Sequence, residues 1–187
     1  MVAAVVVFAS ASGCGPGSAP GDSAPRLSLG ASWKPVDPES YLAPGRRLAA
    51  WSGPEGASLV VYRTVPDPSG TAESVLTTLA NRFANLPGYE IVGRRVEDVA
   101  GTRAARVEVV APGTGSETAP SGLGRATAPE GKALTPTREV TLGFPRPDGS
   151  LFLVWRMPEA ARDKVQPEVA TALASMSMPP LPRPAKY

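Results

Sequence analysis

The sequence predicts an α+β domain in which two helices pack against an antiparallel sheet of about six strands. Apolar runs rich in Val, Leu and Tyr occur in pairs joined by short turns, which is typical of β-hairpins. Two longer segments carry apolar residues at helical spacing. The segments follow one another as hairpin, helix, hairpin, loop, hairpin and helix. This alternation favours a sheet covered by helices.

The first hairpin pairs residues 46–52 with residues 57–65 across the turn sequence GPEG. Residues 68–88 follow as the first helix, because apolar side chains recur at helical spacing from Ala72 to Phe83. A Ser or Thr residue can cap its start, and a Pro–Gly pair ends it.

Two further hairpins are predicted, the second from residues 89–99 and 103–110 and the third from residues 137–144 and 151–157. The last of these four strands is apolar at nearly every position, so it is predicted to lie in the interior of the sheet. Its partner alternates, which predicts a strand covered on one side with Thr141 on the open face.

The final helix is predicted over residues 160–177, and the domain over 33–178. Trp33 lies at the domain edge, where it either fastens the incoming segment or lines a pocket; the first role is favoured. The loop over 111–136 is long for a compact domain, and such loops are either functional or without structure. The Pro-rich tail, residues 179–187, is predicted to be disordered.

Composition excludes several kinds of chemistry. The chain of 187 residues contains no His, so catalytic triads, His general bases and His metal sites are ruled out. One Cys forms neither an internal disulfide nor a Cys-rich zinc site. The net charge is +2 and the basic residues are scattered, whereas nucleic-acid binding needs them clustered on one face. We therefore expect no metal, no cofactor and no nucleic-acid partner.

Short motifs that suggest catalysis fail on inspection. The stretch GDSAP, residues 21–25, lacks the histidine that a serine protease requires. The glycines of residues 122–133 miss the spacing of a phosphate-binding loop. Glu97 and Asp98 are neighbours on a strand and so point to opposite faces, which keeps them from forming a catalytic pair. No catalytic residue is predicted.

The N-terminus carries a different signal. Residues 2–9 form an apolar run of signal-peptide length, too short to span a membrane, and small residues then lead to Cys14. The tetrapeptide ASGC resembles the lipobox of bacterial lipoproteins. The resemblance implies a signal peptide over 1–13, a lipidated Cys14 and a tether through residue 32. The alternative is an ordinary cleaved signal without lipid.

The order of elements also resembles the PsbP-like superfamily, which includes the Mog proteins. The resemblance covers residues 33–178 and rests on Ser32–Trp33, on the stretch VAGTRAARVEV, and on the closing strand and helix. It implies a non-catalytic binding or assembly module with a protein partner in the cell envelope, held at the membrane through lipid on Cys14. Two alternatives stay open: an exported carrier of a small ligand, and an enzyme with a carboxylate-based site that lacks histidine.

Overall fold

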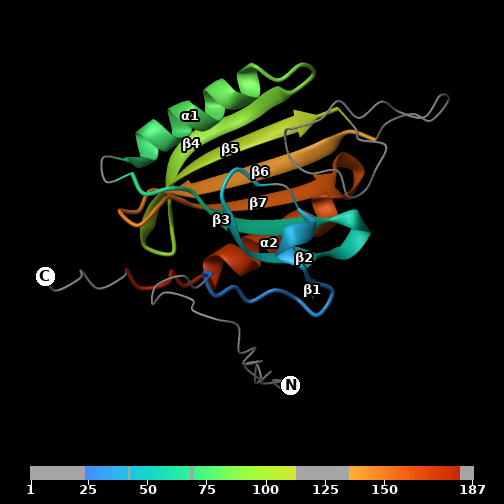
Figure 1. Ribbon diagram of the computed structural model, residues 1–187. Coiled ribbons are helices and arrows are strands. Elements are labelled where there is room, and N and C mark those ends of the chain that lie inside the picture. Colours follow the sequence, from blue (N-terminus) through green and yellow to red (C-terminus); the bar gives the residue numbers. More distant parts are fainter. Residues whose placement is uncertain (1–23, 42, 68–69, 113–134, 182–187) are drawn as a thin grey trace, which may run out of the picture.

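The computed structural model describes residues 24–41, 43–67, 70–112 and 135–181, which form one antiparallel sheet with a helix on each face (Figure 1). Seven strands lie in the order β1-β2-β3-β7-β6-β5-β4. Their bounds are β1 Lys34–Val36, β2 Arg46–Ser52, β3 Ser58–Arg63, β4 Glu90–Val99, β5 Thr102–Ala111, β6 Thr137–Phe144 and β7 Leu151–Pro158. The fold is therefore the predicted α+β class.

The three predicted hairpins are confirmed as β2–β3, β4–β5 and β6–β7. The short strand β1 was not predicted, because three residues that include a proline carry no periodic pattern. It pairs with β2 and forms one edge of the sheet, while β4 forms the other.

The described part of the chain has two α-helices: α1, between β3 and β4, spans Ala72–Ala84, and α2, after β7, spans Arg162–Ala174. Short 3-10 turns lie at Pro38–Ser40, Pro54–Gly56 and Glu159–Ala161. The chain runs from β3 through α1 to β4 at the far edge, then returns strand by strand to β7 beside β3. Helix α1 packs on one face of the sheet and α2 on the other.

Each face of the sheet has its own apolar cluster. The α1 face is packed by side chains that include Val75, Leu79 and Phe83 of α1 and Val107 of β5. The α2 face is packed around Trp155, together with Val165 and Val169 of α2 and residues of β3, β6 and β7. Strand β7 contributes to both clusters, which confirms the prediction that residues 151–157 form an interior strand.

The prediction that β6 has an open face is wrong. Thr141 is only 2% exposed, and its neighbours along the strand are buried on both sides. The alternating sequence indicated one covered face, but a helix lies on each side of the sheet. Arg138, Glu139 and Thr141 of β6 are therefore buried and hydrogen-bonded instead of facing water.

The chain ends also differ from expectation. Residues 24–32 do not stand away from the domain as a tether, because Leu27 and Leu29 pack against the core. The backbones of Arg26 and Ser177 exchange two hydrogen bonds of 3.0 Å, which fixes this segment beside the end of α2. At the other end Pro179 is buried, so the structured part reaches into the predicted tail.

Four predictions fall outside the described residues: the signal peptide, the tether between Cys14 and residue 23, the centre of the 111–136 loop, and residues 182–187. Within the described ranges, none of the helices has the length and apolar character needed to cross a membrane.

Candidate functional site

Cys14, the one site residue predicted from the sequence, lies outside the described residues. The structure instead describes the route by which the N-terminal chain reaches the domain. Trp33 is 6% exposed, and its indole nitrogen donates a 2.7 Å hydrogen bond to Oε2 of Glu168 in α2. The hydroxyl of Ser32 donates to the same oxygen over 3.0 Å. Trp33 thus fastens the incoming segment to α2, the first of its two predicted roles.

Close packing makes this fastening specific. A side-chain carbon at Gly53 would lie 2.8 Å from the Trp33 ring, so only glycine lets the turn after β2 approach the indole. The indole is thereby held between the turn and α2. The N-terminal segment consequently lies on the α2 side of the sheet (Figure 1).

A strip of paired charges crosses the α2 face of β4, β5 and β6. It consists of three arginines and three glutamates in alternation: Arg95, Glu97, Arg106, Glu108, Arg138 and Glu159. We call these six residues the charged strip. The first two lie on β4, the next two on β5 and the fifth on β6, while the last begins the 3-10 turn before α2.

Arg138 is the centre of the charged strip. Its Nε and Nη2 atoms donate bidentate hydrogen bonds of 2.7 and 2.6 Å to Glu159, and Nη1 donates to Glu108. The bonds to Glu159 raise the pKa of Arg138; burial opposes this, and Glu108 adds to the increase. In return, the hydrogen bond from Arg138 lowers the pKa of Glu159. Both groups are therefore charged at neutral pH.

Arg106 is less completely bonded. Its guanidinium approaches Glu97 at 3.5 Å and Glu108 at 3.4 Å, at the long end of hydrogen-bond range. Its Nε atom is buried and has no acceptor among the described residues. Buried donors normally have a partner, so this N–H is one of the few exceptions among the described residues.

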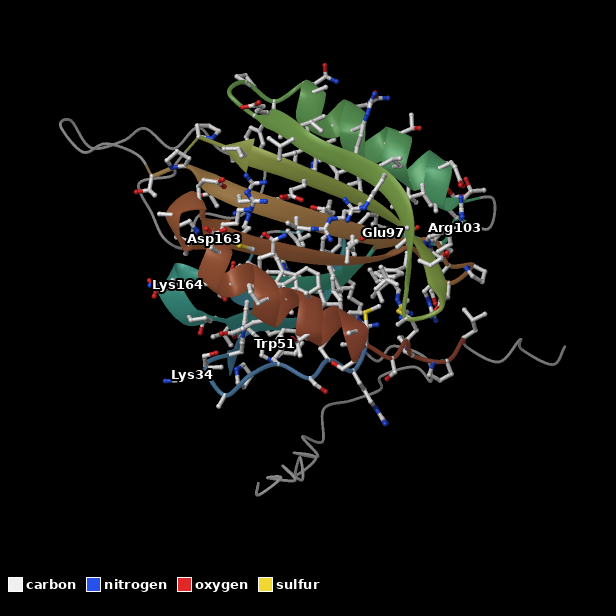
Figure 2. The ribbon with its side chains drawn as sticks, turned by 180° about the vertical axis from the view of Figure 1, so that it is seen from behind. Lys34, Trp51, Glu97, Arg103, Asp163 and Lys164 are labelled. Atoms are coloured by element: carbon white, nitrogen blue, oxygen red, sulfur yellow. The ribbon has the colours of Figure 1, made fainter. Side chains whose placement is uncertain are left out.

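The strip becomes more accessible toward the edge of the sheet. The exposed fraction of the side chain rises from 9% at Arg138 to 55% at Arg95. In Figure 2, which views the α2 side, α2 crosses β7, β3 and β2, and Glu97 lies on the sheet away from the helix. The centre of the strip, at Arg106, Glu108 and Arg138, is therefore largely buried, and its more exposed parts are Arg95 at the edge of the sheet and Glu159 at the other end.

Two other ionic groups hold the domain together. On the α1 face, Glu139 is 3% exposed and accepts hydrogen bonds from Arg156 at 2.8 Å and Thr141 at 3.2 Å. Near the turn between β6 and β7, Arg146 binds Asp148 and the carbonyl of Pro179, which fixes the C-terminal segment. Burial would raise the pKa of Asp148, but hydrogen bonding and charge from Arg146, with charge from Arg63, lower it overall.

The titration behaviour of these groups differs from that of a general acid. A carboxyl group that donates a proton near neutral pH has a raised pKa, normally through burial or a like charge. The carboxyl groups with a resolved shift are Glu73, Asp148 and Glu159, and in each the pKa is lowered by an arginine. Burial raises the pKa of Tyr62 to about 12, which keeps that phenol protonated. Each of these three carboxyl groups is therefore held in its charged form by an arginine.

Sequence reasoning missed the charged strip, although it recognised part of the pattern. The prediction that Glu97 and Asp98 point to opposite faces of one strand is confirmed. What the sequence did not predict was the partner strand. Arg138 meets Glu108 only because β6 pairs with β5, across a long loop.

Comparison with solved structures confirms the PsbP-like fold. The chain is similar to cyanobacterial PsbP (CyanoP) from Synechocystis sp. PCC 6803, with 15% identity over 91% of this chain and 99% of that chain and a TM-score of 0.51. It is also similar to LpqN of Mycobacterium tuberculosis, with 12% identity over 84% of this chain and 86% of that chain and a TM-score of 0.52. No known family profile matches the sequence, and no curated protein matches it.

Proposed function

We propose that this protein is a membrane-anchored, extracytoplasmic and non-catalytic module that binds a protein partner in the cell envelope. The observation that carries the proposal is the charged strip on the α2 face, which reaches the surface at Arg95 and Glu159. Its side chains are fixed by mutual hydrogen bonds, so a charged partner meets a pre-organised surface and loses little side-chain freedom on binding. Alternating charges give such a surface specificity more than affinity.

The anchor in this proposal is lipid on Cys14, supported by the apolar run and the ASGC tetrapeptide. Cys14 lies ten positions before Ala24, where the described chain begins. A chain of that length reaches at most about 35 Å. The anchored domain would therefore stay close to the bilayer, within reach of other envelope proteins.

The neighbours in fold support a role of this kind. LpqN is named as a protein involved in cell envelope biogenesis. Since a shared fold does not fix function, partner binding is tested on the charged strip itself.

The test compares two changes on opposite faces of β5. Arg106→Gln removes a charge from the charged strip, while Arg103→Gln removes one from the α1 face, where Arg103 is exposed and paired with Glu73. Envelope proteins are cross-linked in intact cells, solubilised in detergent and purified with each variant. We expect a discrete cross-linked partner for the wild type and Arg103→Gln, and its loss in Arg106→Gln. Equal cross-linking by all three proteins would contradict the proposed role of the strip.

The same purified protein separates the two alternatives. Native mass spectrometry that finds a small molecule retained in the domain would favour a carrier. Turnover of an envelope component that Glu108→Gln abolishes would favour an enzyme.

A further inference from the structure

Strand β4 leaves a long free edge on the sheet. It has ten residues, Glu90–Val99, whereas β1 at the other edge has three. In the part of the chain that the structure describes, β5 is the only strand that pairs with β4. A long edge strand presents unpaired N–H and C=O groups that favour pairing with another strand.

Two irregularities limit which residues can form such a pair. A bulge interrupts the pairing with β5 between Ile91 and Gly93, and the strand ends at the turn formed by Ala100 and Gly101. Those two turn residues have φ values of 51° and 73°, as in the two-residue turn that suits a hairpin. The regular stretch is therefore Gly93–Val99, and its middle residue is Val96.

The hairpin geometry also determines which groups point outward. A two-residue turn is closed by a pair that exchanges both backbone hydrogen bonds, here Val99 and Thr102. Pairing alternates along the strands from that point. The N–H and C=O groups of Arg94, Val96 and Asp98 consequently point toward the free edge, symmetrically about Val96.

The charged residues of β4 are arranged symmetrically about Val96, with positive charges before it and negative charges after it. Two arginines, Arg94 and Arg95, precede Val96, and two acids, Glu97 and Asp98, follow it. By their pairing with β5, Arg95 and Glu97 lie on the α2 face, while Arg94 and Asp98 lie on the α1 face. An antiparallel copy of this strand centred on Val96 would match every charge with its opposite.

We propose that the free edge of β4 is a homodimer interface, in which two copies pair antiparallel about a two-fold axis at Val96. Each Arg94 then lies opposite Asp98 of the second copy, and each Arg95 opposite Glu97 of the second copy. Directly opposed side chains of opposite charge stabilise a strand pair, and like charges destabilise it. The two seven-stranded sheets become one continuous sheet.

Other registers lack this match. Moving the centre to position 95 sets two copies of Arg95 against each other, and moving it to position 97 does the same with Glu97. A register centred between two residues would set a residue with its side chain on the α2 face opposite one with its side chain on the α1 face. A strand pair does not allow this, because directly opposed side chains lie on the same face. The charges therefore select one register.

The free protein leaves these groups available. Arg94 and Asp98 are exposed, and neither forms an ion pair or hydrogen bond with any described residue. Arg95 binds Glu97 of its own strand at 2.6 Å, but more than half of its side chain remains exposed, so it can turn to a second copy.

The two-fold axis also agrees with the proposed anchor. An axis perpendicular to the sheet keeps the α2 faces of both copies on the same side. The N-terminal segments lie on that side, so both lipid anchors could enter one bilayer. This agreement depends on lipidation of Cys14, whereas the pairing itself does not.

Charge exchange tests the proposal on the full chain with Cys14→Ser, by sedimentation equilibrium. R94D places aspartates at both paired positions, and D98R places arginines at both. We expect the wild type to form dimers and each variant to dimerise about tenfold or more weakly. An equimolar mixture of the two variants should dimerise, because the acidic edge of one matches the basic edge of the other. The double variant R94D/D98R should also recover.

A matched control reverses a charge on the other edge. Lys34 is an exposed residue of β1, so Lys34→Glu should leave dimerisation unchanged. Circular dichroism checks that all variants stay folded. Three results would overturn the proposal. The first is a wild type that remains monomeric up to about 1 mM, which is the effective concentration that two sites reach when a short linker joins them. The others are dimers that R94D does not weaken, and single variants that fail to dimerise when they are mixed.

Discussion

Leu153 and Thr141 are both buried, but for different physical reasons. Leu153 lies in the middle of β7 with no exposed surface, surrounded by the apolar cluster of the α2 face. Thr141 lies on the neighbouring strand, on the α1 face, and donates a hydrogen bond to the buried carboxylate of Glu139. One residue fills space, and the other satisfies a buried charge.

We predict that both residues are costly to replace. Leu153→Ala leaves a cavity and should lower the free energy of unfolding by about 2–5 kcal/mol. Thr141→Val keeps the shape but removes a donor to a buried carboxylate, which should cost about 1–3 kcal/mol. Urea denaturation measures both, with exposed Thr77→Ala as a control that should change stability by less than about 0.5 kcal/mol. A Thr141→Val variant as stable as the control would mean that this face of β6 is open.

At the scale of elements, local signals predicted the hairpins and helices well. Turn residues and apolar spacing lie within each element, so the sequence shows them directly. The order of strands depends on which elements meet across the sheet, and local patterns do not contain it. The burial of Thr141, the contact between Arg138 and Glu108, and the docking of Leu27 all follow from that order.

Helix α1 gives the sharpest test at this scale. Thr71 accepts a hydrogen bond from the backbone of Ser74, and the Ser74 hydroxyl accepts one from the backbone of Thr71. This reciprocal cap satisfies two backbone donors at the helix start. Thr71→Ala should therefore lower stability by about 1 kcal/mol, and Thr71→Ser should restore most of it. Thermal denaturation measures this difference in stability. Equal melting temperatures for Thr71→Ala and the wild type would show that the cap does not stabilise the folded protein.

At the scale of the whole molecule, arginine–carboxylate groups join elements that are far apart in sequence. The charged strip links β4, β5 and β6 to the turn before α2. Arg63, Asp148 and Arg146 link β3 to the turn before β7 and to the C-terminal segment. Removing one partner of a buried ion pair is strongly destabilising, because it leaves the other charge buried without compensation.

These pairs predict a loss of stability in acid. The carboxyl pKa of Glu159 is lowered below its usual 4.5 by the hydrogen bond from Arg138, so the unfolded chain binds protons more readily than the folded protein. The stabilising contribution is complete above the usual pKa and is lost as the pH falls through the lowered value. Glu159→Gln removes this contribution. The melting temperature of the variant should fall less steeply than that of the wild type below about pH 4.5. Parallel curves for the two proteins would show that Glu159 is not linked to folding.

Membrane anchoring through Cys14 is the central claim of the proposed function, and labelling with a fatty-acid analogue tests it most directly. Cells expressing the wild type or Cys14→Ser are fed an alkyne-tagged fatty acid and separated into membrane and soluble fractions. We predict that the wild type carries the label and sediments with membranes, while Cys14→Ser carries none and is released. A wild type without label that is found in the soluble fraction would contradict the claim.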